Sequence, residues 1–255
     1  MINLVKSEMY RLFHTKSFWI LNIVLLIVAL IAPNLSASVN ETHVSAGSGT
    51  TGAMGFLDSM GNTMFYLIVV TSFIASYICA GFEQRTVQDS VAAGGGRGKI
   101  LLSKTLCIYV AAFIMLLVYS VTYMFAVVLL KHGGFGMDGN IISRMALSFF
   151  AVFIQQIAQI TLIILIAFAL KKASIVIAIG ISFFTVGMLL LSASAFRFEW
   201  LGKLLEFTPF FGKSSITSGF TAPMGDYMQT IILGVIWIIA LLGMTYSIFK
   251  KAELR

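Results

Sequence analysis

The stretch from Ala146 to Leu170, ALSFFAVFIQQIAQITLIILIAFAL, contains no charged residue and decides the fold class. A helix rises about 1.5 Å per residue and the hydrocarbon core of a bilayer is about 30 Å thick. A membrane span therefore needs about 20 mostly apolar residues, and this stretch is long enough. We expect it to cross a bilayer as one helix.

Other segments on both sides of this stretch have the same character. Spans are expected at approximately Phe18 to Ser38, Thr63 to Gly81, Thr105 to Leu130, Ala173 to Ser192 and Tyr227 to Phe249. Hydrophobic residues make up 59% of the chain and charged residues 11%, whereas soluble domains carry roughly 25% charged residues. The sequence therefore predicts an all-α polytopic membrane protein with six transmembrane helices in a single domain, residues 1–255.

The distribution of the 17 Lys and Arg residues predicts the orientation. If the N-terminus lies inside, the following lie on the cytoplasmic side: Lys6, Arg11, Lys16, Arg85, Arg97, Lys99, Lys104, Lys171, Lys172, Lys250, Lys251 and Arg255. Only Lys131, Arg144, Arg197, Lys203 and Lys213 then lie outside, and the loop from Pro33 to Asn62 has neither residue type. The positive-inside rule therefore places both termini in the cytoplasm.

Helical periodicity predicts an amphipathic helix before the first span, within residues 1–16. Its apolar residues fall within an arc of about 100° and its charged residues lie outside that arc. The apolar set is Ile2, Val5, Met9, Leu12 and Phe13, and the polar set is Lys6, Glu8, Arg11 and His14. We expect this helix to lie on the inner membrane surface, the alternative being a solvent-facing extension of the first span.

The outer segments differ from one another in composition. The first is rich in Ser, Gly and Thr from Ser45 to Gly52, which predicts a mobile link without chemistry. Between the fifth and sixth spans, aromatic and Leu residues are interleaved with Arg, Lys and Glu; they include Phe196, Phe198, Trp200, Leu204, Leu205, Phe207, Phe210 and Phe211. This mixture predicts short helices in the outer interface, with Pro209 as a helix breaker.

Motifs for soluble-enzyme chemistry are not supported. Gly134 to Gly139 matches G-x-G-x-x-G but follows a membrane helix, without the strand–helix context of a dinucleotide site. The run Gly94 to Lys99 lacks the first Gly and the final Ser or Thr of a phosphate-binding loop. The three His residues lie in different segments, and no metal site, catalytic residue, cofactor or nucleic-acid partner is predicted. The two cysteines, Cys79 and Cys107, are expected to be buried apolar residues in a reducing compartment.

The segment after the second span is short, cytoplasmic in this topology and helical in pattern. It begins Phe82-Glu83-Gln84-Arg85-Thr86-Val87 and continues to Ser90, before a triple glycine at Gly94 to Gly96. A short helix held between two spans can act as a lever for a cytoplasmic partner. We call Phe82 to Ser90 the coupling segment; the alternative is a positively charged loop without a partner.

Here the chain resembles the ABC type-2 transporter permease family. Members carry a Glu-x-Gly-Thr type coupling segment and an Arg-x-Lys-Ile-x-x-x-Lys run into the third span. Glu83-Gln84-Arg85-Thr86 and Arg97-Gly98-Lys99-Ile100 with Lys104 are similar, although Arg85 stands where Gly is usual. The resemblance extends to the N-terminal surface helix, the six spans and the aromatic outer segment.

This resemblance implies an export permease in the bacterial plasma membrane. Its coupling residues would be Phe82, Glu83, Gln84, Arg85, Thr86 and Val87, which receive a separate ABC ATPase subunit. A second permease copy would complete the transporter, as a homodimer or a heterodimer. ATP and Mg²⁺ would bind only the partner ATPase, so this chain would be no enzyme and would hold no cofactor.

The fourth span holds the main polar feature within the bilayer, a polar stripe of Ser148, Gln155, Gln156 and Gln159 on one helix face. Polar side chains avoid lipid, so the stripe faces protein or water. Two interpretations stay open: hydrogen bonds between helices, or the lining of a substrate pathway.

The resemblance also bears on the cargo. Small six-span members of the family resemble exporters for lantibiotic immunity or phenol-soluble modulins, which implies an amphipathic or antimicrobial peptide. Export of a drug, lipid or glycan is an alternative within the family, and a non-transport accessory membrane protein is an alternative outside it. An ion channel would need a polar or charged ring, and the spans show none.

Overall fold

A computed structural model describes residues 2–35, 51–84, 86, 88, 96–131, 134–205, 207–210, 216–217 and 222–251. All regular elements in these ranges are helices. They are α1 (Ile2–His14), α2 (Lys16–Leu35), α4 (Gly52–Gly61), α5 (Met64–Glu83), α7 (Arg97–Lys131), α8 (Gly139–Leu170), α9 (Ala173–Ser182), the π-helix η2 (Phe183–Gly187), α10 (Met188–Arg197), α11 (Glu199–Leu205) and α12 (Met224–Lys251).

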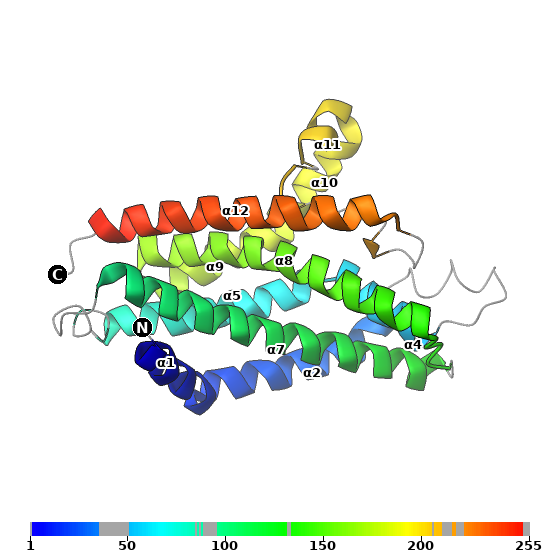
Figure 1. The fold of residues 1–255 in the computed structure, drawn as a ribbon, viewed down its shortest axis with the longest axis horizontal. Coiled ribbons are helices and arrows are strands. Elements are labelled where there is room, and N and C mark those ends of the chain that lie inside the picture. Colours follow the sequence, from blue (N-terminus) through cyan, green and yellow to red (C-terminus); the bar gives the residue numbers. More distant parts are fainter. Residues whose placement is uncertain are drawn as a thin grey trace.

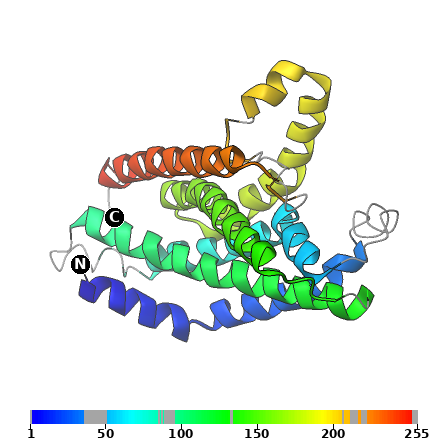
Figure 2. The same cartoon turned by 45° about the vertical axis from the view of Figure 1, so that its right-hand side comes forward.

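The expectation of six membrane-length helices is confirmed within the described ranges. Lys16–Asn34, Met64–Glu83, Arg97–Leu130, Gly139–Leu170, Ala173–Leu191 and Met224–Lys251 are long and apolar enough to cross a membrane. Five of these spans are single α-helices, and the fifth in chain order runs through α9, η2 and α10. A π-helix inside a longer helix bends its path, and α10 and α11 project away from the bundle (Figure 2).

The long helices lie side by side, and their ends alternate between the two ends of the bundle (Figure 1). Helix α1, the end of α5, the start of α7 and the end of α12 share one end, and α4 lies at the other (Figure 1). Arg97 joins two of these ends, because its guanidinium donates to the carbonyl oxygens of Phe249 at 3.2 Å and Lys250 at 2.6 Å. The first and last helices of the described chain therefore begin and end on the same side.

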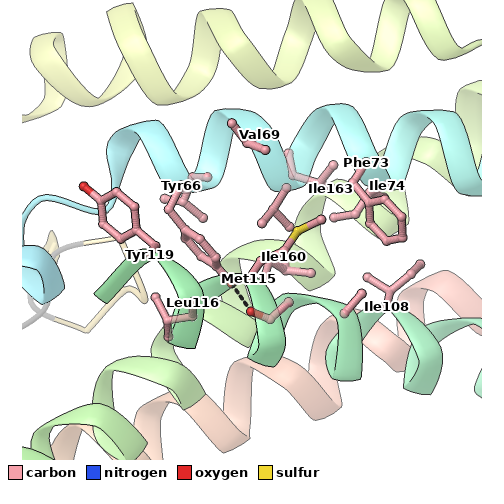
Figure 3. Packing of buried hydrophobic residues seen from close by; sticks show 14 of the residues in the cluster. Tyr66, Val69, Phe73, Ile74, Ile108, Met115, Leu116, Tyr119, Ile160 and Ile163 are labelled. Atoms are coloured by element: carbon pink, nitrogen blue, oxygen red, sulfur yellow. Dashed lines mark hydrogen bonds between the residues drawn. The ribbon is translucent and has the colours of Figure 1, made fainter. Parts of the chain in front are cut away.

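The core lies around α5, which packs against α2, α7, α8 and α9. Figure 3 shows Phe73 and Ile74 of α5 among Ile108 and Met115 of α7. The buried Tyr66 hydroxyl donates to the carbonyl oxygen of Ala112 at 3.0 Å, drawn as the dashed line. A buried hydroxyl without such a partner would be costly, and here it joins two helices.

A glycine lets α8 and α12 approach closely. A Cβ atom added to Gly234 would lie 2.8 Å from Cγ2 of Ile154. Small residues at helix crossings allow the two backbones to approach closely. In membranes, where the hydrophobic effect does not drive helices together, such van der Waals contacts stabilise helix pairs. The α8–α12 pair is the most extensive helix contact in the described structure.

Part of the first outer segment, predicted from sequence as a link, is the short helix α4. Thr51 caps it, and its hydroxyl oxygen accepts from the backbone N–H of Met54 at 3.4 Å. The three glycines at 52, 55 and 61 obscured this helix in the sequence, since glycine is a poor helix former. Residues 36–50, which include most of the predicted link, lie outside the described ranges.

Residues Ile2–His14 form the helix α1, which packs against α7; its location on the inner membrane surface stays a prediction. Leu12, which belongs to the apolar arc, is fully buried within the protein. Glu8, which the periodicity places on the polar face, faces the bundle instead and pairs with Lys104 at 2.9 Å. The pattern could not indicate this, because the partner lies in another helix.

Candidate coupling and cavity sites

The coupling segment begins as the last turn of α5. Phe82 and Glu83 are the final residues of α5. The backbone N–H of Gln84 donates to the carbonyl oxygen of Ala80 at 2.9 Å and completes this last turn. The Thr86 hydroxyl donates to the carbonyl oxygen of Gly81 at 3.1 Å. Arg85, Val87 and residues 89–95 lie outside the described ranges.

Phe82 anchors this segment to two other helices. Its ring is 5.6 Å from that of Phe168 in α8 and 6.4 Å from that of Phe249 in α12, and the latter two rings are 5.2 Å apart. All three rings are buried, and Lys171 places its ammonium 5.6 Å from the Phe82 ring centroid. We call Phe82, Phe168 and Phe249 the aromatic cluster; it joins the ends of α5, α8 and α12.

Glu83 and Gln84 behave differently from Phe82, because both are exposed. The segment thus has a buried anchor and neighbouring polar side chains open to the surface at the same end of the bundle. A partner that binds the exposed residues would bear directly on the aromatic cluster. Such close contact between rigid helices transmits displacement, because packed interiors deform little.

The polar stripe of α8 contacts backbone as well as side chains. Gln155 and Gln159 both donate through Nε2 to the carbonyl oxygen of Pro209, at 3.1 Å and 2.6 Å. Gln156 donates to the Thr63 hydroxyl at 2.8 Å. Ser148 Oγ lies 3.2 Å from the Tyr227 hydroxyl oxygen and 3.4 Å from the carbonyl oxygen of Ile216.

Pro209 was predicted as a helix breaker in the outer interface, and the structure adds a function for its carbonyl group. The turn at 207–210 folds back onto α8, and Trp237 of α12 donates to the carbonyl oxygen of Phe207 at 2.9 Å. Irregular backbone within a membrane needs such partners from protein. The spacing of Gln155 and Gln159 by one helical turn was the available signal, but the sequence could not identify the partner.

A cavity of about 510 Å³ lies beside the stripe. Gln155, Gln156 and Gln159 line one side, and the start of α5 and the π-helix η2 contribute Thr63, Phe184 and Thr185. None of the described lining residues is charged. The volume falls within the roughly 300 to 1,000 Å³ typical of small-molecule sites. Ser148 is not among the lining residues, so the cavity contains three of the four predicted pathway residues.

Two buried oxygen atoms beside this cavity have no hydrogen-bond partner among the described residues: Oε1 of Gln156 and Oε1 of Gln159. Both side chains are only 2% exposed. The bond from Gln159 to the Pro209 carbonyl fixes its amide orientation, because a carbonyl oxygen can only accept. Oε1 of Gln159 is therefore an acceptor that lacks a donor in the described structure, and Oε1 of Gln156, whose Nε2 donates to the Thr63 hydroxyl, lacks one there as well. Such groups are rare in protein interiors.

A second cluster, which the sequence did not reveal, lies at the α1 end. Glu8 contacts Lys104 and Arg11, at 2.9 Å and 3.1 Å, and accepts a hydrogen bond from the Tyr77 hydroxyl. Burial acts to raise the pKa of the Glu8 carboxyl, but Lys104, Tyr77 and Arg11 together outweigh it and hold the pKa below 4.5. Glu8 therefore stays ionised at neutral pH and ties α1 to α5 and α7.

The described residues contain no group of three or more His, Cys, Asp or Glu side chains that could hold a metal ion. Cys79 and Cys107 are both buried thiols in the interior of the bundle. Comparison of the chain with models of known protein families and with curated proteins finds no match.

Proposed function

We propose that this protein is the transmembrane subunit of an ATP-driven exporter whose ATPase is a separate, soluble subunit. One observation carries the proposal: Phe82 anchors the coupling segment to the ends of α8 and α12 through the aromatic cluster. Helix α8 also carries the glutamines that line the cavity. A force on the exposed residues Glu83 and Gln84 would thus move the helix that lines the cavity.

The energy for such a movement comes from the partner. ATP binding would bring two ATPase subunits together, and each would displace the coupling segment of one permease copy. Packed helices respond to such displacements as rigid bodies. Because the Phe82 ring lies against α8 and α12, both helices would shift with the segment, and the cavity between α5, α8 and η2 would change shape.

The proposed cargo is an amphipathic molecule that enters from the membrane. An amphipathic or antimicrobial peptide fits the resemblance, and its apolar face would suit a cavity whose described lining residues are all uncharged. A lipid-like cargo is the second candidate, and one observation favours it. The cavity volume of about 510 Å³ falls within the range of small-molecule sites, which suits a single-chain lipid better than a whole peptide.

Co-purification tests the exporter proposal. We expect a soluble ATPase with Walker motifs to be encoded beside this chain. It should bind the detergent-solubilised permease, and its ATPase rate should rise when candidate peptides are added. Phe82→Ala and Glu83→Ala should each lower binding or stimulation about tenfold. Phe65→Ala is the matched control, since Phe65 lies at the other end of α5 and is 44% exposed.

Two results would reject the exporter proposal. If Phe82→Ala and Glu83→Ala bind and stimulate the ATPase as well as the unmodified permease does, the coupling assignment is wrong. If no neighbouring ATPase exists or binds, the exporter proposal fails, and a non-transport membrane protein becomes the better interpretation.

A further inference from the structure

We infer that the cavity beside Gln156 and Gln159 binds a neutral, single-chain, lipid-like amphiphile whose head group donates hydrogen bonds. That this ligand is a transported cargo rests on the proposed function. Binding of the ligand to the cavity requires neither the ATPase nor transport. Three properties of the cavity, as far as the described residues define it, carry the inference: acceptors without a donor, lining residues without charge and exposed apolar side chains at its edge.

The unpaired acceptors define the head group. Oε1 of Gln156 and Oε1 of Gln159 are buried and have no donor within the described part of the chain, while the Nε2 atoms of the same side chains donate to Thr63 and Pro209. A ligand must therefore supply hydrogen-bond donors rather than acceptors. Hydroxyl and amide N–H groups do this, and an ether or ester oxygen does not.

Charge defines the head group further. None of the described lining residues is charged, so no described side chain compensates the cost of burying a carboxylate, phosphate or ammonium group. That cost is large for an unpaired ion. The ligand is thus neutral, with an alcohol, a glycerol or an amide as its polar part.

Apolar side chains at the exposed edge of the cavity indicate the chemistry of the rest of the ligand. Met64 and Leu189 both line the cavity and are 42% and 66% exposed. They belong to two membrane-length helices, so their exposed apolar surfaces suit contact with lipid chains. An alkyl chain can enter between them without passing through water, and Met60, Met188 and Phe184 provide apolar surface inside.

Photolabelling of the full chain in lipid nanodiscs tests this inference. The probe is monodecanoylglycerol, which has about 17 non-hydrogen atoms and two hydroxyl donors, with a diazirine in its chain. The comparison probe is its dimethyl ether, which has the same chain and no donor. We expect adducts on Met60 and Met188, about tenfold more abundant with the hydroxyl probe, because one hydrogen bond to a buried acceptor is worth about this factor.

Variants separate the acceptors from the apolar walls. Gln156→Leu with Gln159→Leu should abolish the tenfold preference, whereas Gln229→Leu in α12, outside the cavity lining, should retain it. The decanoate anion should compete at least tenfold less well than monodecanoylglycerol. Since the double variant also removes the bonds to Thr63 and Pro209, the comparison of the two probes in the unmodified chain tests the inference without it.

Three results would overturn the inference: equal labelling by both probes, equal competition by decanoate, or adducts only on exposed α12 residues such as Ile236. Equal labelling would mean that water satisfies the two oxygen atoms. Selective labelling of the cavity without ATPase binding would reject the exporter proposal and leave the amphiphile site standing. ATPase binding without selective labelling would reject the amphiphile site and leave the exporter proposal standing.

Discussion

Glu8 is the residue whose role depends most on its neighbours. Its side chain is 12% exposed, and its partner Lys104 is 3% exposed. Removing a charge from water costs free energy unless the charge is paired. The ion pair therefore offsets the desolvation cost of both Glu8 and Lys104. Arg11 and Tyr77 complete the network and place α1 against α5 and α7.

Removal of the Glu8 charge should therefore destabilise the protein. Glu8→Gln leaves the Lys104 ammonium buried without its anion, and we expect a loss of about 3 kcal/mol in stability. The apparent melting temperature in detergent micelles, followed by circular dichroism, measures the loss. Adding Lys104→Met should restore most of it, and a double variant as unstable as Glu8→Gln alone would contradict the ion-pair explanation.

The shifted pKa of Glu8 predicts how the stability of the protein depends on pH. The pKa of Glu8 is lower in the folded protein than its ordinary value of 4.5, so its ionised form stabilises the fold. This contribution is fully present above pH 4.5 and is lost as the pH falls through the lower, folded-state pKa. The stability difference between the unmodified chain and Glu8→Gln should stay constant from pH 7 to about 5 and shrink below that. A difference that is unchanged down to pH 3 would exclude this role.

At the scale of elements, glycine positions decide how closely α4 approaches α7. A Cβ atom on Gly55 would lie 2.8 Å from Cγ2 and 2.9 Å from Cβ of Val127. Such distances require the helices to separate. The close contact also brings Asp58 of α4 to 2.5 Å from the Tyr123 hydroxyl, so the two helices are joined by a hydrogen bond.

Gly55→Ala should therefore cost about 1 to 3 kcal/mol, the usual range for overpacking a well-packed contact. Thermal unfolding in detergent measures this. Gly61→Ala is the matched control in the same helix, because its Cβ would meet Thr217 Oγ1 at an ordinary 3.5 Å. We expect that control to be neutral or slightly stabilising, since alanine favours helix over glycine. Equal loss in both variants would indicate a general effect on α4.

At the scale of the whole molecule, six of the described helical segments are long and apolar enough to cross a membrane, and α1 and the end of α12 share one side of the bundle (Figure 1). The Lys and Arg distribution predicts that this side is cytoplasmic. The proposed function depends on this orientation, because the coupling segment must lie on the side where ATP is found.

Cysteine labelling in intact cells tests the orientation. Lys172→Cys lies in the turn between α8 and α9, and Asn140→Cys lies at the opposite end of α8; both positions are exposed. A membrane-impermeant maleimide should label Asn140→Cys and spare Lys172→Cys until the cells are permeabilised. The native thiols at 79 and 107 are buried, which keeps the background low. The reverse pattern would place the coupling segment outside and remove the exporter proposal.

The sequence by itself determined the number and positions of the spans. Apolar runs without charge are a local property, and bilayer thickness converts their length into helices, so the six expected spans agree closely with α2, α5, α7, α8, the α9–α10 path and α12. The N-terminal helix and the polar stripe were also predicted from local periodicity. The helix α4 was missed, because Gly52 and Gly55, which allow its close contact with α7, oppose helix formation locally.

Only the tertiary structure decided which residues meet. Glu8 with Lys104, Phe82 with Phe168 and Phe249, and Gln159 with the Pro209 carbonyl are each separated by tens of residues in the chain. The sequence left open whether the stripe bonds to protein or lines a pathway; in the structure Gln155, Gln156 and Gln159 make hydrogen bonds and also line the cavity. Periodicity identifies a helix face, but the group opposite that face depends on helix packing, which single-sequence patterns do not encode.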